Sequence, residues 1–285
     1  MGAIIRSIAI ATFSIVSMAQ AFAGGAVASA SFESKHLKRT WVYDVYLPEG
    51  YADGKQRLPV LYFFHGTGGR GTDWFVKGGL HLTLDNLIAS GAIPPTIVVS
   101  PDAGKSWYVD RAEQMETAIL EDLIPEVQRR FRTIESREGR LLAGHSMGGY
   151  GVLRFVLEHP DRFAAAALMS PAIYADQPAS NSTARTVGVF GSPDFDPAVW
   201  KSLSYPAQWD AFMAQKQTVP MFISSGDDDT AILAESVQLY TKLVAAHQPA
   251  ELRVVNGAHV WPVWAGISPE ALTYIYRYAR RPSLP

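Results

Sequence analysis

Residues 141–149 read LLAGHSMGG, an apolar stretch that runs into the pattern Gly144-x-Ser146-x-Gly148. In a tight turn between a buried strand and a helix, glycines two positions before and after a serine let its hydroxyl stand clear of the sheet. The pattern is short enough to arise by chance, but here an apolar strand precedes it and a helical pattern follows. We therefore predict that Ser146 is a nucleophile; the alternative is a serine with a purely structural role in the turn.

Apolar runs and amphipathic segments alternate on both sides of this turn. Short apolar runs predict strands, and apolar residues at helical spacing predict helices. Strict alternation is typical of a mostly parallel sheet with helices on both faces, so the predicted fold class is α/β. The expected strands cover residues 31–47 (at a sheet edge), 59–64, 96–100, 140–143, 164–169, 219–224 and 251–255, and the expected helices cover 80–89, 113–131, 147–158, 232–246 and 269–280.

A single domain is expected over residues 24–285, because neither a linker nor an internal repeat divides this part of the sequence. An insertion at about residues 172–218 interrupts the alternation; it is rich in Pro, Ser and Asp and has only weak periodicity. Long loops in compact domains are often functional. The insertion is therefore either a lid or pocket wall, or a plain surface excursion.

Residues 1–23 have the pattern of a secretory signal peptide. Arg6 gives the start a positive charge, residues 8–19 are almost all apolar, and Ala21-Phe22-Ala23 fits a small-x-small cleavage site. The apolar run is shorter than the roughly 20 residues that a membrane-spanning helix needs, which disfavours an uncleaved anchor. We expect a mature protein that is secreted or periplasmic and that has no stable membrane association.

The composition excludes several classes of function. The 285 residues carry a formal net charge of -2, so the chain has no basic field and no nucleic acid partner is expected. The absence of cysteine excludes disulfides, thiolate metal sites and a cysteine nucleophile. The seven histidines show no metal-ligand spacing such as His-Glu-x-x-His, so neither a metal nor another cofactor is expected.

A serine nucleophile needs a base, which is usually a histidine that follows it in chains of this alternating type. Three histidines follow Ser146. His159 ends the helix that starts at the serine and lies too far along it to fold back, and His247 is expected at a solvated helix end. His259 comes directly after the last predicted strand, where a loop would present it to the serine. We predict that His259 is the base.

The base needs an acid that orients it, and this acid should follow the preceding strand. Asp227, Asp228 and Asp229 stand there in a row, and the residues alone barely separate them. Two of the three have simpler roles as helix caps or as part of a solvated turn, and adjacent like charges discourage the burial of more than one. A calcium site is disfavoured because the ligand spacing of a calcium loop is missing.

Acyl transfer also needs hydrogen-bond donors for the oxyanion of the tetrahedral intermediate. The main-chain N–H of Met147, directly after the serine, is the first expected donor. The glycine-rich loop His65-Gly66-Thr67-Gly68-Gly69 follows an early buried strand, and the N–H of Thr67 is the expected second donor. A phosphate-binding loop is disfavoured because neither a Lys-Ser/Thr pair nor an immediate helix follows these glycines.

Four tryptophans follow the strands whose ends should form the site. We predict that they line an apolar or aromatic substrate pocket, and the alternative for each is core packing. These residues are Trp74, Trp107, Trp261 and Trp264.

Taken together, the motifs resemble the esterase D-like branch of the α/β-hydrolases, and among its members the feruloyl esterases in particular. The resemblance extends from about residue 40 to residue 280. Its motifs are FHGTGG at 64–69 with Asp73-Trp74 after it, DNLI at 85–88, AGHSMGG at 143–149, and GAH at 257–259 followed by Trp261 and Trp264.

The resemblance implies an α/β-hydrolase fold and a serine esterase. It implies that Asp229 is the triad acid, with Asp228 the second choice, and it places the oxyanion donors at Met147 and Thr67, in agreement with the interpretation of the residues themselves. The expected export departs from the S-formylglutathione hydrolases of the group, which are normally cytoplasmic. The insertion carries no motif that identifies an acyl group.

We therefore expect a secreted or periplasmic serine esterase that hydrolyses carboxylic esters of small molecules through a Ser-His-Asp triad and an acyl-enzyme. Aromatic acyl groups of the feruloyl type and short acyl chains are the expected substrates. One alternative is an acyltransferase of the mycolyltransferase type, which would use the same triad. The other is a catalytically silent binding protein on the same fold.

Overall fold

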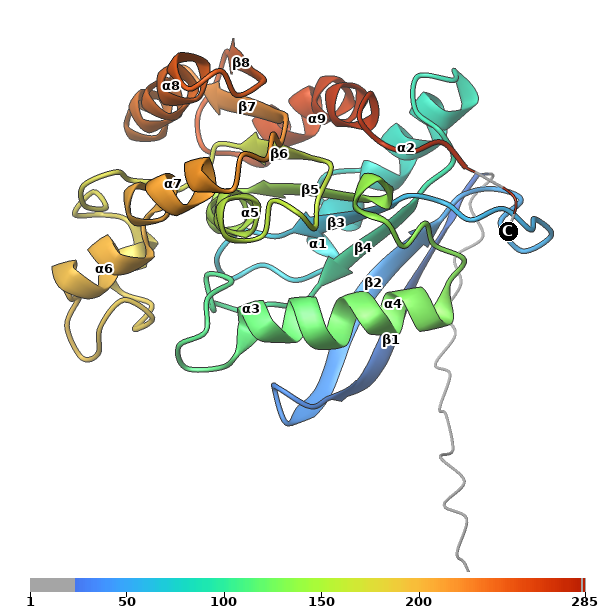
Figure 1. The fold of residues 1–285 in the computed structure, drawn as a ribbon, viewed down its shortest axis with the longest axis horizontal. Coiled ribbons are helices and arrows are strands. Elements are labelled where there is room, and N and C mark those ends of the chain that lie inside the picture. The colour runs from blue at the N-terminus through green and yellow to red at the C-terminus, as the bar shows by residue number, and fades with distance from the viewer. Residues whose placement is uncertain (1–23, 283, 285) are drawn as a thin grey trace, which may run out of the picture.

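The computed structural model describes residues 24–282 and residue 284, and the expected signal peptide lies outside these residues. Within them, eight strands form one sheet in the order β1-β2-β4-β3-β5-β6-β7-β8 (Figure 1). The first two strands pair antiparallel with each other, and β2 pairs antiparallel with β4. All other pairs are parallel. The strands are β1 (Ala26–Ser34), β2 (Arg39–Leu47), β3 (Val60–Phe64), β4 (Ile97–Pro101), β5 (Arg140–His145), β6 (Ala165–Met169), β7 (Met221–Gly226) and β8 (Ala250–Val255).

Helices cover both faces of the sheet, and each face has its own core. On one face the buried residues of α3, α4, α5 and α8 pack on the strands, and α7 contacts α5 from outside. On the other face α1, α2 and α9 form the second core. The helices are α1 (Asp73–Val76), α2 (Leu80–Ala89), α3 (Met115–Ala118), α4 (Ile124–Arg130), α5 (Met147–Glu158), α6 (Pro197–Leu203), α7 (Tyr205–Ala214), α8 (Thr230–Ala245) and α9 (Trp261–Tyr276).

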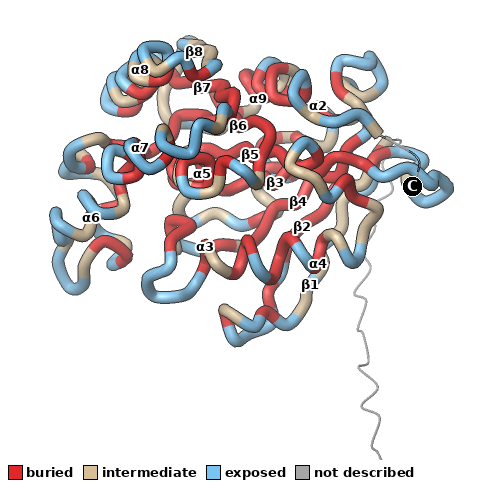
Figure 2. The backbone as a smooth tube through the Cα atoms, in the orientation of Figure 1, coloured by how far each residue is buried: buried red, intermediate tan, exposed pale blue. Residues whose placement is uncertain are grey.

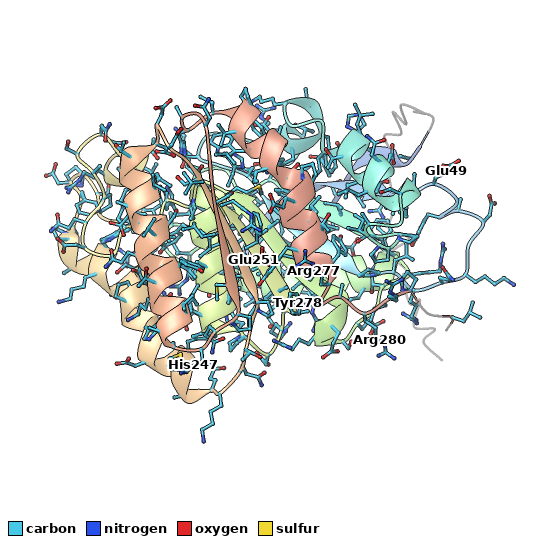
Figure 3. The ribbon with its side chains drawn as sticks, turned by 90° about the horizontal axis from the view of Figure 1, so that it is seen from above. Glu49, His247, Glu251, Arg277, Tyr278 and Arg280 are labelled. Atoms are coloured by element: carbon cyan, nitrogen blue, oxygen red, sulfur yellow. The ribbon has the colours of Figure 1, made fainter. Side chains whose placement is uncertain are left out.

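The covering helices explain why the central strands are continuous apolar runs. Every residue of β3, β4, β5, β6 and β7 is buried, as a parallel sheet between two helical layers requires (Figure 2). Strand β1 alternates between exposed and partly buried residues because it lies at the sheet edge. Seen from above, α8 and α9 flank β8: His247 follows α8, Arg277 follows α9, and Glu251 lies on the strand (Figure 3).

The structure confirms the α/β fold class and corrects the expected start of the last helix. The last helix begins at Trp261, eight residues before the expected start at Pro269, because Pro262 fits the first turn and Pro269 is accommodated inside the helix. The insertion, where the weak periodicity predicts no particular element, contains α6 and α7. Both helices are short and have a proline in the first turn, and α6 is capped by Asp196, so too few turns exist for a clear periodicity.

No helix among residues 24–282 is both long and apolar enough to cross a membrane.

Candidate active site

Ser146 lies in the turn between β5 and α5, and its backbone is strained. Its φ of 54° and ψ of -121° are rare for a residue with a side chain. A β-carbon at Gly148 would collide with the main-chain oxygen of Phe64, and one at Gly144 would meet the main chain of Gly148 at 2.6 Å. The two glycines are therefore required by close approach of the backbone, as the sequence pattern predicts.

The structure brings Ser146, His259 and Asp229 together in one hydrogen-bonded series. Ser146 Oγ lies 2.8 Å from His259 Nε2. On the other side of the ring, His259 Nδ1 lies 2.5 Å from Asp229 Oδ2. A carboxylate only accepts hydrogen bonds, so the proton of the neutral imidazole belongs on Nδ1 and leaves Nε2 free to accept from the serine hydroxyl. In such a series the ring nitrogen can take the hydroxyl proton while the carboxylate orients the ring.

The loops after β7 and β8 support this series through bonds to each other. Asp227 accepts a hydrogen bond of 2.8 Å from the N–H of Gly257, and the N–H of Asp228 donates one of 3.0 Å to the carbonyl of Gly257. The side chain of Asp229 is 12% exposed, whereas Asp227 and Asp228 are exposed residues. Of the three neighbouring aspartates, Asp229 is the one that meets the histidine.

The glycine-rich loop after β3 lies directly against the serine. A β-carbon at Gly66 would be 3.4 Å from the β-carbon of Ser146. Thr67, the next residue, lines the same cavity as the serine, and Met147 is the first residue of α5. The positive end of the dipole of a 12-residue helix adds to the attraction for a negative charge at this point. The two expected oxyanion donors are thus on segments that border the nucleophile.

Ser146 lines a cavity of about 430 Å³ whose wall contains both aromatic and polar side chains. Trp261 and Trp264, at the start of α9, give the cavity wall its aromatic surface. Polar lining comes from Thr67, from Asp73 and Lys77, and from the insertion, which contributes Asn181, Ser182 and Thr183. Thr183 and Thr67 are joined by a hydrogen bond of 3.4 Å between their hydroxyls. The insertion therefore forms part of the cavity wall.

Trp74 and Trp107 do not line this cavity, which corrects the expectation that they contact substrate. Both side chains are almost fully buried. Trp74 packs on Phe63 and on Trp261, with ring centroids 4.1 Å and 5.2 Å away. Trp107 packs in the other core. These two tryptophans are core residues and not part of the cavity wall.

His145 lines the cavity, although no sequence pattern singles it out. Its ring lies between Trp264, with centroids 4.3 Å apart, and Trp74, 5.0 Å away. Burial lowers the pKa of His145 well below its usual value, and the nearby His65, His259 and Lys77 lower it further. A neutral His145 places no positive charge beside the ring of His259.

The remaining histidines after the serine lie away from the site. His159 bonds Glu116 on α3 at 3.2 Å, and His247 is exposed after α8. Within the described residues no group of three or more His, Asp and Glu side chains is arranged to hold a metal ion.

Comparisons of the sequence identify relatives that carry esterase names. The family model described as "Putative esterase" matches residues 34–273. An endo-1,4-beta-xylanase/feruloyl esterase of Xylanibacter ruminicola is 36% identical over 160 residues, which are 53% of this chain and 22% of that protein. Esterase Rv1288 of Mycobacterium tuberculosis is 29% identical over 243 residues, 76% of this chain and 52% of that protein. The chain thus spans about a fifth and about half of the length of these two relatives.

Solved structures share the fold over nearly the whole described chain. A ferulic acid esterase superposes with a TM-score of 0.74 at 26% identity and covers 89% of this chain and 98% of its own. An S-formylglutathione hydrolase from Agrobacterium tumefaciens superposes with a TM-score of 0.72, and the match covers 94% of this chain and 100% of that chain. Because the two sequences are only 19% identical, this likeness shows the fold alone. The chain has the α/β-hydrolase fold and belongs to the "Putative esterase" family.

Proposed function

We propose that this protein is a serine esterase that hydrolyses carboxylic esters through an acyl-enzyme. The observation that carries the proposal is the series Ser146 Oγ to His259 Nε2, 2.8 Å, and His259 Nδ1 to Asp229 Oδ2, 2.5 Å, beside an open cavity. A hydroxyl with a base in reach, and an acid behind the base, is suited to acyl transfer. Membership of an esterase family supports the same reaction class.

In the proposed reaction, Ser146 Oγ attacks the ester carbonyl carbon while His259 Nε2 takes the hydroxyl proton. Asp229 stabilises the resulting imidazolium, and the N–H groups of Met147 and Thr67 bind the oxyanion. The bond to the alcohol oxygen then breaks, and His259 returns its proton to the leaving alkoxide. Water then attacks the acyl carbon while His259 takes one of its protons. The bond between this carbon and Ser146 Oγ breaks, His259 returns the proton to Oγ, and the carboxylic acid leaves.

We propose that the acyl group is aromatic or short. Trp261 and Trp264 offer planar apolar surface next to the serine, and the 430 Å³ cavity is within the common range for small ligands. A relative named for feruloyl esterase activity and a structural neighbour named ferulic acid esterase support an aromatic acid.

The test is a panel of p-nitrophenyl esters from acetate to palmitate, together with methyl ferulate. We expect the highest kcat/KM for acetate, butyrate or ferulate. Trp261→Leu should lower kcat/KM for methyl ferulate about tenfold and should affect the acetate ester less, because only the aromatic acid stacks on the ring. A preference for palmitate would contradict the acyl class, and failure to hydrolyse any ester would contradict the esterase proposal.

We also propose that the protein is exported and that cleavage after Ala23 makes Gly24 the mature N-terminus. Asp85 on α2 accepts hydrogen bonds from the N–H of Gly25, 2.9 Å, and from the hydroxyl of Tyr46, 2.6 Å, both on Oδ1. Its Oδ2 is buried without a hydrogen-bond partner within the described chain. Gly24 lies so close that a β-carbon there would collide with Oδ2. A new α-ammonium group at Gly24 would supply the missing partner.

The chain that starts at Gly24 is expected to be more stable than the same chain with one alanine added in front. Pairing of a buried carboxylate oxygen contributes about 1–2 kcal/mol, or about 2–6 °C in Tm for a chain of this size. Asp85→Asn should remove the difference between the two chains, and thermal unfolding measures it. Equal Tm values for the two wild-type chains would contradict the pairing of the Gly24 α-ammonium group with Asp85. Mass spectrometry of the exported protein tests the cleavage site separately.

A further inference from the structure

The loop after β4 holds two neighbouring aromatic residues in a backbone conformation that such residues rarely adopt. Trp107 has a φ of 54° and Tyr108 a φ of 59°. A bulky side chain at positive φ is strained, and such strain persists only where the surrounding structure holds it. Both residues are buried, with 1% and 0% exposure, so the strained pair places two large rings at defined positions in the core.

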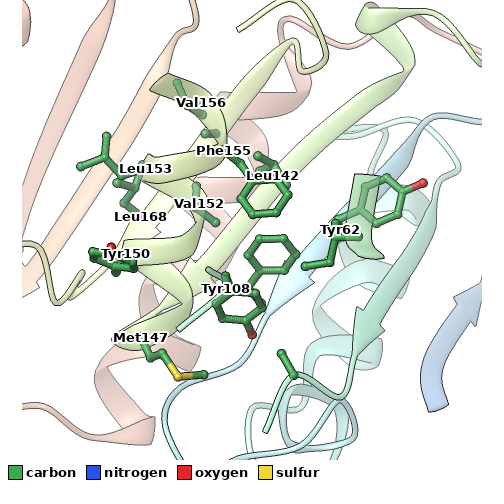
Figure 4. Packing of buried hydrophobic residues seen from close by; sticks show 14 of the residues in the cluster. Tyr62, Tyr108, Leu142, Met147, Tyr150, Val152, Leu153, Phe155, Val156 and Leu168 are labelled. Atoms are coloured by element: carbon green, nitrogen blue, oxygen red, sulfur yellow. The ribbon is translucent and has the colours of Figure 1, made fainter. Parts of the chain in front are cut away.

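Tyr108 contacts both segments that carry the proposed oxyanion donors. Its ring stacks on Phe64, the last residue of β3, with centroids 4.3 Å apart and an interplanar angle of 11°. On the side of α5, a β-carbon at Gly151 would lie 2.6 Å from the ring, so glycine is needed to admit it. The hydroxyl of Tyr108 donates a hydrogen bond of 3.0 Å to the carbonyl of His65. Figure 4 shows the ring beside α5, with the hydroxyl turned toward the chain that leaves β3.

The side chain of His65 also holds the carbonyl of the next residue, Gly66, through a hydrogen bond. The main-chain N–H of Ala103 donates to His65 Nε2 at 2.9 Å, so Nε2 carries no proton and Nδ1 does. His65 Nδ1–H in turn donates to the carbonyl of Gly66 at 2.8 Å. Burial lowers the pKa of His65, which keeps the ring in this neutral form.

The two bonded carbonyls fix the peptide planes on either side of Gly66. This matters because glycine itself restricts its backbone angles very little. The carbonyl of Gly66 and the N–H of Thr67 belong to one planar trans peptide and point in opposite directions. The N–H of Gly69 also donates to this carbonyl, at 3.0 Å. Hydrogen bonds to the carbonyl therefore set the direction of the Thr67 N–H.

We propose that Tyr108 is a positioning residue for the oxyanion hole. Its ring lies against the helix that begins with Met147, and its hydroxyl holds the loop that contains Thr67. Tyr108 thereby sets the spacing between the two N–H donors. This inference rests on the proposed esterase function. Burial raises the pKa of Tyr108 well above its usual value, so the hydroxyl stays protonated and able to donate over the working pH range.

The test compares Tyr108→Phe with Tyr62→Phe. Both changes delete one buried phenol hydroxyl, but the hydroxyl of Tyr62, on β3, has no hydrogen-bond partner within the described chain and points away from Tyr108 (Figure 4). Tyr108→Phe should lower kcat for p-nitrophenyl acetate about 10- to 100-fold and leave KM within about twofold. Removal of a whole oxyanion donor costs about 10²- to 10³-fold, and misplacement should cost less. Tyr62→Phe should keep the wild-type kcat.

Two further measurements separate positioning from loss of folded protein. Rates are expressed per active site titrated with a fluorophosphonate, so unfolded molecules do not count. Phenylboronic acid, whose tetrahedral adduct with Ser146 places an oxygen in the oxyanion hole, should bind Tyr108→Phe more weakly by about the same factor as kcat falls.

A wild-type kcat per titrated site in Tyr108→Phe would overturn the inference and leave the esterase proposal intact. The inference also fails if KM rises while kcat is unchanged, or if Tyr62→Phe loses as much activity as Tyr108→Phe. A wild-type protein that neither hydrolyses esters nor reacts with the fluorophosphonate would overturn the proposed function, and the inference with it.

Discussion

Ser146→Ala is expected to lower kcat for any ester that the wild type hydrolyses by about 10⁵- to 10⁶-fold. Without the hydroxyl no acyl-enzyme can form, and His259 has no oxygen nucleophile at 2.8 Å. Some acceleration over water should remain, because the oxyanion donors and the cavity are intact. Stopped-flow release of p-nitrophenol measures the fall in kcat and the rate that remains. The wild type should show a burst of one equivalent if deacylation is slow, and the mutant should show no burst.

Ser146→Gly supplies the matched control, since it also lacks the hydroxyl. The φ of 54° at this position strains any residue with a β-carbon, at a cost of about 1–3 kcal/mol, and glycine removes that strain. Ser146→Gly should therefore be as inactive as Ser146→Ala but should unfold at a higher temperature. If Ser146→Ala keeps more than about a tenth of the wild-type kcat, the serine mechanism is wrong.

The order of strands and helices could be predicted because burial on both faces leaves a simple signal. In a sheet covered by helices, each central strand is an uninterrupted apolar run such as Val60–Phe64, and amphipathic segments lie between the runs. The signal fails for short helices. The insertion contains α6 and α7, of 7 and 10 residues, each with a proline in its first turn, and the sequence pattern predicts neither. The sequence signal also fails at Trp261. The first turn of α9 is apolar, so the sequence pattern does not distinguish it from the loop before it.

The sequence alone could locate those candidate site residues whose chemistry allows them few positions in the chain. A nucleophile turn admits few sequences, so Ser146 stands out, and the order of the elements then leaves His259 as the histidine that follows a strand. The residues alone could not show which of the three neighbouring aspartates is the acid. All three have the same side chain, and they differ only in the direction in which it points. The resemblance to a family was needed to select Asp229.

The tryptophans and Tyr108 show that the order of residues along the chain does not determine the direction in which a side chain points. Trp74 and Trp261 both follow strand ends in the sequence, yet the first is fully buried and the second lines the cavity. Which way a side chain points depends on neighbours that are distant along the chain, such as Gly151 for Tyr108. No pattern of residue types announces a positive φ at Trp107 and Tyr108, because the strain is imposed by the tertiary structure.

Asp229→Asn is expected to lower kcat about 10⁴-fold with little change in KM. The carboxylate accepts from Nδ1–H of His259 at 2.5 Å and so keeps Nε2 available to the serine. An amide nitrogen at the same place would donate instead, and the imidazole would then carry its proton on Nε2, where it cannot accept one from Ser146. The imidazolium would also lose the negative charge that stabilises it. Initial rates with p-nitrophenyl acetate at saturating and limiting concentrations separate kcat from KM.

Asp228→Asn makes the same chemical change one residue earlier and is the control for it. Asp228 is exposed, and the main-chain N–H that bonds it to the loop of His259 is kept in the variant, so kcat should stay within about twofold of the wild type. The opposite ranking, with Asp228→Asn inactive and Asp229→Asn active, would move the acid to the neighbouring position. Equal, small effects of both changes would mean that His259 works without an orienting carboxylate. The two aspartates carry the same charge one residue apart, so any difference in kcat reports the hydrogen bond to His259 rather than the electrostatic field of the loop.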